Sequence, residues 1–270
     1  MIQSKYIFSA TGFTTKTCVG LAFYVITITF SLCAAAKDLP DVIDSLRASI
    51  VGIGTIRPVR GAKRPPVDFR GTGFVVGNGH QIITNYHVIP ETIKTDKSVS
   101  LAVFVGRGKK AKVLPAKVLR TDPDHDLALL EIAGAPLPSV RLGADDFVRE
   151  GSDIAFTGFP IGMVLGLYPV THRGIISAIT PIVIPAISSS NLTAKQLKRM
   201  RNPFEVYQLD ATAYPGNSGS PVYVRDSGRV IGVINSVFVK GSKEAVLEKP
   251  SGISYAIPVK YVRTLLNGKR

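Results

Sequence analysis

A glycine-flanked serine in the last third of the chain has the residue types that acyl transfer needs. Ser218 lies in the sequence GNSGSP (216–221). The flanking glycines allow the backbone to turn tightly and to expose the hydroxyl. The backbone N–H groups of Gly216 and Ser218 can then point at one spot beside that hydroxyl, which is the arrangement of an oxyanion hole. On its own, the motif could equally be a Gly/Ser surface turn.

Two further motifs supply a base and a carboxylate. His87 lies near the end of TNYHVI (84–89), and Asp126 opens the apolar run DLALLEI (126–132). Each has a structural interpretation when it is taken alone, as a buried histidine or a turn cap. Serine chemistry, however, needs a base that takes the hydroxyl proton and a buried carboxylate that holds the imidazole in one tautomer. Together the motifs predict Ser218 as nucleophile, His87 as base and Asp126 as the orienting carboxylate.

Neighbouring residues compete for these roles. Asp122 and Asp124 are alternatives to Asp126, but only Asp126 directly precedes an apolar strand that would bury it. His125 is expected to be solvated, and His172 is expected near the rim of the cleft. The four histidines lack the spacing of metal ligands, and no complete dinucleotide-binding loop is present, so neither a metal nor a cofactor is expected.

The elements that would position these residues read as β-strands. Short runs of Val, Ile, Phe and Tyr alternate with turn residues, which predicts an antiparallel sandwich or a pair of barrels. The runs lie at 49–56, 71–76, 80–89, 99–106, 126–132, 153–159, 173–179, 229–239 and 252–258. Asn78-Gly79 predicts a tight hairpin turn with positive φ at both residues. Helices are expected at 38–50, 194–201 and 258–266.

The order of the motifs divides the chain into two halves. We expect an N-terminal barrel at 37–145 that carries His87 and Asp126, and a C-terminal barrel at 146–270 that carries Ser218. The low-periodicity stretch 133–150 is the natural connection. The active site would then lie in the cleft between the halves.

The first 36 residues resemble an export signal. An apolar stretch runs from Lys16 to Lys37 and ends on AAA (34–36), which predicts a cleaved signal peptide and a periplasmic or extracellular protein. The alternative is an uncleaved N-terminal anchor, since about 19 apolar residues can just span a bilayer. Loss of this segment would lower the net charge from +14 to +12.

With these motifs the chain resembles the chymotrypsin-fold serine proteases, and among them the HtrA/Deg type. The segments that carry the resemblance are GTGFVV (71–76), TNYHVI (84–89), DHDLALL (124–130), GNSGSP (216–221) and GISYAIPVKYV (252–262). It covers about residues 48–266 and implies an all-β fold of two six-stranded barrels with few short helices. It also implies a triad of His87, Asp126 and Ser218, with an oxyanion hole formed by the amides of Gly216 and Ser218.

The resemblance implies an exported serine endopeptidase that acts on unfolded proteins in quality control or processing. HtrA relatives are often trimers, and many carry a PDZ domain, for which no room is expected after residue 266. The base of the primary pocket would be Thr212, with Ile234 and Asn235 on the following strand. Because this pocket carries no charge, we expect cleavage after small or medium aliphatic residues.

Basic side chains suggest a second function. They cluster at Arg57, Arg60, Lys63, Arg64 and Arg70, and again at Lys195, Lys198, Arg199 and Arg201. These clusters could be solvated faces, or they could dock the chain on an anionic surface or an acidic protein. The alternative to a protease is therefore a catalytically silent scaffold. Nucleic acid is not expected as a partner, because no recognition motif is present.

Overall fold

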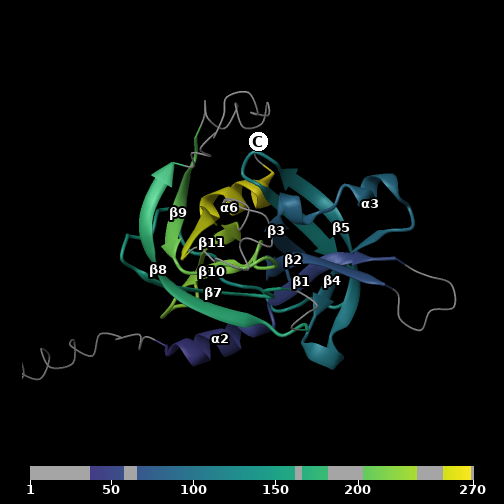
Figure 1. Ribbon diagram of the computed structural model, residues 1–270, viewed down its shortest axis with the longest axis horizontal. Helices are drawn as coiled ribbons and strands as arrows, with labels where there is room; N and C mark the ends of the chain where they lie inside the picture. The colour runs from purple at the N-terminus through teal and green to yellow at the C-terminus, as the bar shows by residue number, and fades with distance from the viewer. Residues whose placement is uncertain (1–36, 58–65, 162–165, 182–202, 236–251, 269–270) are drawn as a thin grey trace, which may run out of the picture. The chain divides into compact units, whose positions relative to one another are not determined.

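Two closed six-stranded barrels make up the fold (Figure 1). The structure is a computed structural model, and it describes residues 37–57, 66–161, 166–181, 203–235 and 252–268. Lys37–Arg270 form one compact unit. The expected all-β class, with a chymotrypsin-like pair of six-stranded barrels and few short helices, is confirmed.

The first barrel is antiparallel and closes in the order β1-β2-β3-β6-β5-β4. Its strands are β1 (Ile50–Ile56), β2 (Val67–Val76), β3 (Gln81–Asn85), β4 (Ser100–Val105), β5 (Lys112–Asp122) and β6 (Leu127–Ile132). Short apolar strands of this kind bury one face against the others, and Ile53, Ile82 and Leu130 are fully buried. For the site, the important pairing is β3 with β6, which places Asn85 opposite Leu127.

The second barrel repeats the pattern in the order β10-β11-β12-β9-β8-β7. Its strands are β7 (Asp153–Gly158), β8 (Val170–Pro181), β9 (Glu205–Asp210), β10 (Pro221–Val224), β11 (Val230–Asn235) and β12 (Ile253–Pro258). Its apolar interior includes Phe156, Leu209, Val222 and Ile234. The segment between β9 and β10 carries the glycine-flanked serine.

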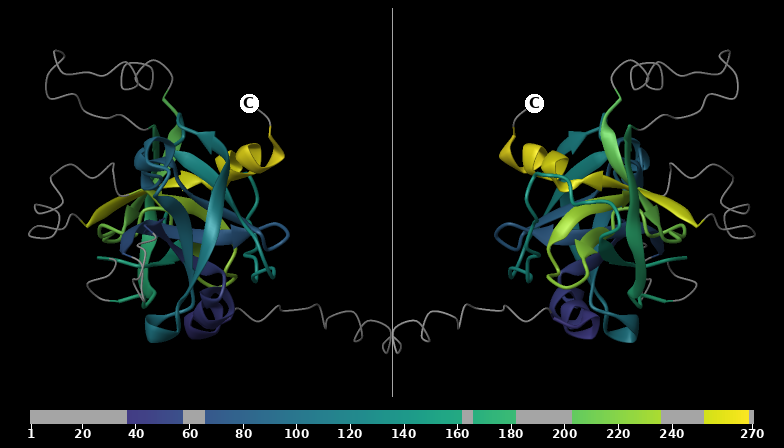
Figure 2. Two further views of the ribbon diagram at one scale, coloured as in Figure 1. Left: turned by 90° about the vertical axis from the view of Figure 1, so that its right-hand side faces the viewer. Right: turned by 90° about the vertical axis from the view of Figure 1, so that its left-hand side faces the viewer.

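Two nine-residue helices lie on the barrels, α2 (Leu39–Arg47) and α6 (Val259–Asn267), on opposite sides of the molecule (Figures 1 and 2). α6 contacts β5 and β6 of the first barrel and β11 and β12 of the second. Its C-terminus is closed by Gly268 in the left-handed conformation. The Arg120 side chain donates to the carbonyls of Leu265 and Leu266 there, so a cation of the first barrel caps this helix.

Short helical turns occur between β3 and β5 of the first barrel: η1 (Tyr86–Val88), α3 (Thr92–Thr95) and η2 (Gly108–Lys110). The expected helices at 38–50 and 258–266 are present, although the first ends at Arg47 and gives way to β1. The expected strand at 80–89 is wrong beyond Asn85, where the chain turns into η1. The connection at 133–150 holds no helix or named strand.

The expected hairpin is confirmed, because β2 pairs antiparallel with β3, but its tight turn at Asn78-Gly79 is wrong. β2 ends at Val76 and β3 begins at Gln81, so the loop has four residues. Positive φ occurs at Gly77 (61°) and Gly79 (87°), not at Asn78. The Asn78 side chain instead accepts the backbone N–H of His80, a local bond that stabilises a wider turn.

Several expectations lie outside the described residues: the signal peptide or anchor at 1–36, the helix at 194–201, and most members of the two basic clusters. Across the part of the chain that is described, no helix has both the length and the apolar character to cross a membrane.

The packing of α6 predicts a stability effect. Leu265 is 6% exposed and belongs to the core, whereas Thr264 on the same helix is exposed. Leu265→Ala should lower the free energy of unfolding by about 2–5 kcal/mol, because it removes buried apolar area and leaves a cavity. Reversible urea unfolding measures this, with Thr264→Ala as control at about 0.5 kcal/mol or less. Equal effects of the two variants would contradict the packing of α6 on the barrels.

Candidate active site

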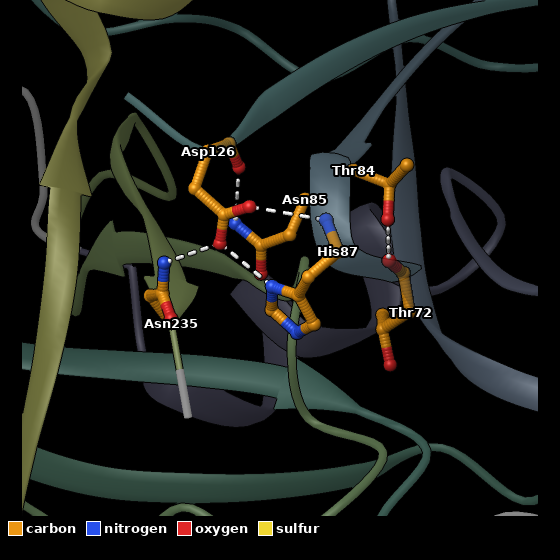
Figure 3. A network of polar contacts seen from close by, with 6 residues as sticks. All are labelled: Thr72, Thr84, Asn85, His87, Asp126 and Asn235. Atoms are coloured by element: carbon orange, nitrogen blue, oxygen red, sulfur yellow. Dashed lines mark hydrogen bonds and ion pairs between the residues drawn. The ribbon is translucent and has the colours of Figure 1, made fainter. Parts of the chain in front are cut away.

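The strand pairing of the first barrel brings His87 and Asp126 together. Because Asn85 at the end of β3 faces Leu127 at the start of β6, the residues just beyond these two ends must meet. His87 Nδ1 lies 2.6 Å from Asp126 Oδ2, and the His87 backbone N–H donates to Asp126 Oδ1 at 3.0 Å. The carboxylate thus fixes both the backbone and the ring of the histidine. In Figure 3 the second ring nitrogen, Nε2, faces away from the carboxylate.

Asp126 is held in an uncommon backbone conformation. Its φ is 55°, in the left-handed region that few non-glycine residues adopt and that aspartate tolerates better than most. Its carbonyl accepts the Asn85 side-chain amide at 3.1 Å and the Tyr86 backbone N–H at 3.0 Å. These bonds stabilise the turn that aims the carboxylate at His87.

Asn235, at the end of β11 in the second barrel, completes the surroundings of Asp126. Its Nδ2 donates to Asp126 Oδ2 at 2.7 Å, and its side chain is fully buried (Figure 3). A buried carboxylate needs such donors, since a charge without partners in the interior costs several kcal/mol. Asp126 Oδ2 therefore receives an amide N–H from one side and faces the imidazole on the other.

The segment that carries Ser218 is tightly folded and buried. Gly216 (φ 97°) and Gly219 (φ 90°) adopt conformations that only glycine takes readily, as the sequence predicts for this turn. A Cβ on Gly216 would also collide with the Phe159 carbonyl oxygen, so this position needs glycine for space as well as for its φ. Ser218 itself is 4% exposed.

Ser218 lies against the barrel that carries His87. Its carbonyl accepts the Thr72 backbone N–H from β2 at 2.9 Å. A Cβ built on the adjacent Gly71 would lie 2.8 Å from a Val88 methyl and 2.9 Å from the Ser218 carbonyl oxygen. Gly71 thus lies between the residue that follows His87 and the serine, so the fold brings the three predicted triad segments to one place.

The other histidines have different surroundings. The His125 ring is bonded to Asp122 at 2.6 Å, stacks on Tyr261 with centroids 4.0 Å apart, and is only 27% exposed. The expectation that His125 is solvated is therefore wrong. Burial acts to raise the pKa of Asp122, but its bonds with His125 outweigh this and lower the pKa. Asp122 is thus engaged with His125 and not with His87.

His172 on β8 lies next to the segment 216–221 that carries Ser218, which we call the nucleophile segment. Its ring stacks on Phe156 with centroids 4.7 Å apart, and its Nε2 faces the Asn217 side-chain amide at 3.4 Å. Burial lowers the pKa of His172, because an imidazolium loses hydration there. The neutral ring can accept the Asn217 N–H, so the fold favours the uncharged form next to the serine.

The expected pocket residues lie in the segment before Ser218 and on β11. Thr212 is half-buried between β9 and β10, where the Ser254 hydroxyl accepts the Ala213 N–H and donates to the Ala211 carbonyl. Ile234 is fully buried, and both its backbone groups bond to the nucleophile segment. Contact of these residues with a substrate stays a prediction. The side chains of Ile234 and Asn235 are both fully buried.

Sequence reasoning missed two polar residues at this site. Asn85 and Thr72 are both fully buried and both bond to segments that carry predicted catalytic residues. It also assigned Asn235 a pocket position without its bond to Asp126, which joins residues 109 apart in sequence. A polar residue inside an apolar strand run is the only signal that could have pointed to them.

Comparison with known proteins identifies this architecture. A family model described as a trypsin-like peptidase domain matches residues 71–233. The chain belongs to the trypsin-like peptidase family. A relative from Pseudomonas putida (strain W619), a probable periplasmic serine endoprotease, DegP-like, is 28% identical over 207 residues, or 75% of this chain and 35% of the relative. A relative of the same description from Chlamydia pneumoniae is 33% identical over 189 residues, or 70% of this chain and 32% of the relative.

This trypsin-like peptidase chain spans about a third of the length of these curated relatives. Among solved structures it is similar to Deg5, with a TM-score of 0.57 and 26% identity over 83% of this chain and 90% of that one. The HtrA-type protease AlgW with a tripeptide gives a TM-score of 0.60 at 22% identity, over 86% of this chain and 63% of that one. The resemblance to the HtrA/Deg type is thus confirmed.

The environment of His172 predicts a pH effect on stability. Its pKa is lowered by burial from the ordinary value of 6.5, so below about pH 6.5 the unfolded chain binds a proton that the folded chain does not. Stability from this residue is therefore complete above pH 6.5 and is lost as the pH falls below it. Between pH ~7.5 and ~5.5 the wild type should lose more unfolding free energy than His172→Gln. Parallel losses in urea unfolding would contradict this.

Proposed function

We propose that this chain is an exported serine endopeptidase that hydrolyses protein substrates through Ser218, His87 and Asp126. The observation that carries the proposal is the His87–Asp126 pair, which is fixed by two bonds and lies on the barrel face that holds the serine segment. The trypsin-like peptidase family and the DegP-like relatives support the reaction class. Names of periplasmic relatives support export, which the apolar leader also predicts.

The contacts suggest how each residue acts. The Nδ1–H of His87 donates to Asp126, so the unprotonated Nε2 can take the Ser218 hydroxyl proton. The serine oxygen then bonds to the substrate carbonyl carbon, and the amides of Gly216 and Ser218 stabilise the negative oxygen. The C–N bond breaks as the protonated imidazole gives its proton to the leaving amine. Water then attacks the acyl carbon and gives a proton to the imidazole, and the C–O bond to Ser218 breaks as the serine oxygen takes that proton back.

We further propose an uncharged primary pocket around Thr212 that accepts small or medium aliphatic side chains. Thr212 carries no charge, and burial lowers the pKa of His172, whose ring lies 5.9 Å from that of Tyr214, two residues after Thr212. A single such pocket contact discriminates only about 10- to 200-fold, which suits a protease with many unfolded substrates. Protein quality control or processing is the role that this breadth favours.

A fluorophosphonate probe tests the proposal directly, because it phosphonylates only a serine that a working base has activated. The purified chain should be labelled, and mass spectrometry should place the label on Ser218. Ser218→Ala should not be labelled. A well-folded wild type that stays unlabelled from mildly acidic to mildly alkaline pH would favour the catalytically silent scaffold instead.

The carboxylate assignment can be tested with a matched pair of variants. Asp126→Asn should lower turnover by about 10⁴, because the asparagine would hold the wrong imidazole tautomer. Asp122→Asn is the control, since Asp122 bonds to His125 in an equivalent His–Asp contact that is not part of the triad. Turnover of a chromogenic peptide should separate the two variants clearly. A loss of less than about tenfold in Asp126→Asn would mean that another group orients His87.

A further inference from the structure

Thr72 joins the first barrel to the nucleophile segment through both its backbone and its side chain. It lies in β2 and is fully buried. Its N–H donates to the Ser218 carbonyl at 2.9 Å, and its hydroxyl donates to the Gly216 carbonyl at 2.7 Å. The same hydroxyl accepts the Phe159 N–H at 3.0 Å. The Thr72 hydroxyl thus donates to one segment of the second barrel, at Gly216, and accepts from another, at Phe159.

Peptide planarity turns these bonds into a constraint on the two peptide planes that follow Gly216 and Ser218, which alternate with the planes of the oxyanion amides. The C=O of one residue and the N–H of the next lie in one plane and point in opposite directions. Fixing the Gly216 carbonyl therefore fixes the Asn217 N–H, which donates to Tyr214 at 2.9 Å. Fixing the Ser218 carbonyl likewise fixes the Gly219 N–H.

The two peptide planes that carry the Gly216 and Ser218 amides are held within the second barrel. The Pro215 carbonyl accepts the Ile161 N–H at 2.6 Å, and the Asn217 carbonyl accepts the Ser220 N–H at 2.9 Å. Consecutive planes from Pro215 to Ser218 thus alternate between a partner in the second barrel and Thr72. The bonds to Thr72 connect this segment to the first barrel, which carries His87.

The Thr72 hydroxyl also acts on the corner that holds the Gly216 amide. Phe159, whose N–H it accepts, lies two residues before Ile161, and Ile161 has a φ of 55°. A β-branched residue in the left-handed region is strained, so its neighbours must hold it there. Loss of the hydroxyl would leave the Phe159 N–H and the Gly216 carbonyl without this partner in a buried place, and the corner could then shift.

We propose that Thr72 is a positioning residue for acyl transfer, whose hydroxyl holds the Gly216–Asn217 peptide, which lies between the two oxyanion amides, in register with His87. This inference rests on the proposed protease function and adds a specific residue to it. Thr72 does not touch substrate. It acts through the backbone of Gly216 and Ser218, so its loss should slow chemistry more than it weakens substrate binding.

Two substitutions separate the hydroxyl from the methyl group of Thr72. Thr72→Val keeps the shape and loses the hydroxyl, whereas Thr72→Ser keeps the hydroxyl and loses the methyl. We expect Thr72→Val to lower kcat on a chromogenic peptide by about 10- to 100-fold, since a displacement of about 1 Å can cost about 10²-fold. KM should stay within about threefold of the wild type, and Thr72→Ser should keep kcat within about threefold.

Thr157→Val is the matched control for loss of a buried hydroxyl. Thr157 on β7 is 2% exposed, and its hydroxyl bonds to those of Thr171 and Tyr223, not to the nucleophile segment. This variant should lose stability and retain the wild-type kcat. If Thr72→Val is recovered unfolded, Thr72→Cys replaces it, because a thiol fills the site but hydrogen-bonds weakly.

The outcomes distinguish failure of this inference from failure of the proposed function. A wild type that a fluorophosphonate does not label overturns both. A labelled wild type whose folded Thr72→Val or Thr72→Cys variant reacts at the same rate overturns only the role of Thr72. The role is also overturned if Thr72→Ser loses as much kcat as Thr72→Val, because packing of the methyl group would then be the cause.

Discussion

A buried carboxylate is the constraint on which the arrangement of the site depends. Asp126 is 5% exposed, and a charge at such depth is tolerated only when donors surround it. Two of these donors belong to His87, and a third comes from Asn235 on the other barrel. The need to solvate one acid with protein groups therefore fixes the histidine and also ties the end of β11 to the first barrel. The same three bonds stabilise the fold and orient the His87 ring.

Polar bonds across the two barrels give the site a register that apolar packing alone would not give. Hydrophobic contacts are non-directional and scale with area, so they tolerate small sliding of one barrel against the other. The bonds from Thr72 to Gly216 and Ser218, and from Asn235 to Asp126, have defined lengths and directions. Buried networks of this kind are stable only when their members are paired, which makes one arrangement strongly preferred over its neighbours.

The sequence carried much of this site because its signals are local. The glycines around Ser218 predict its tight backbone turn, and the apolar run after Asp126 predicts that this region is buried. β5 was not predicted: it is exposed along most of its length, and a proline and charged residues interrupt its short apolar pairs. The bonds of Asn85 and Asn235 to Asp126 and the role of Thr72 could not be predicted, because they join residues 41 to 146 positions apart and depend on barrel closure. The environment of His125 was missed for the same reason, since Tyr261 comes from the final helix.

Division of the predicted triad between two closed barrels explains why the residues that support it are small and buried. Each barrel is closed, so neither has a free edge along which a strand could adjust to improve the site. Alignment must then come from short side chains at the junction, since long ones would add rotamer freedom and lose precision. Thr72, Thr84 and Asn235 fit this need: all are fully buried, and Thr84 donates to the Thr72 carbonyl at 2.7 Å (Figure 3). That bond holds β2 on β3, the strand that leads into His87, so Thr84 and Thr72 together link this strand to the segment that carries Ser218.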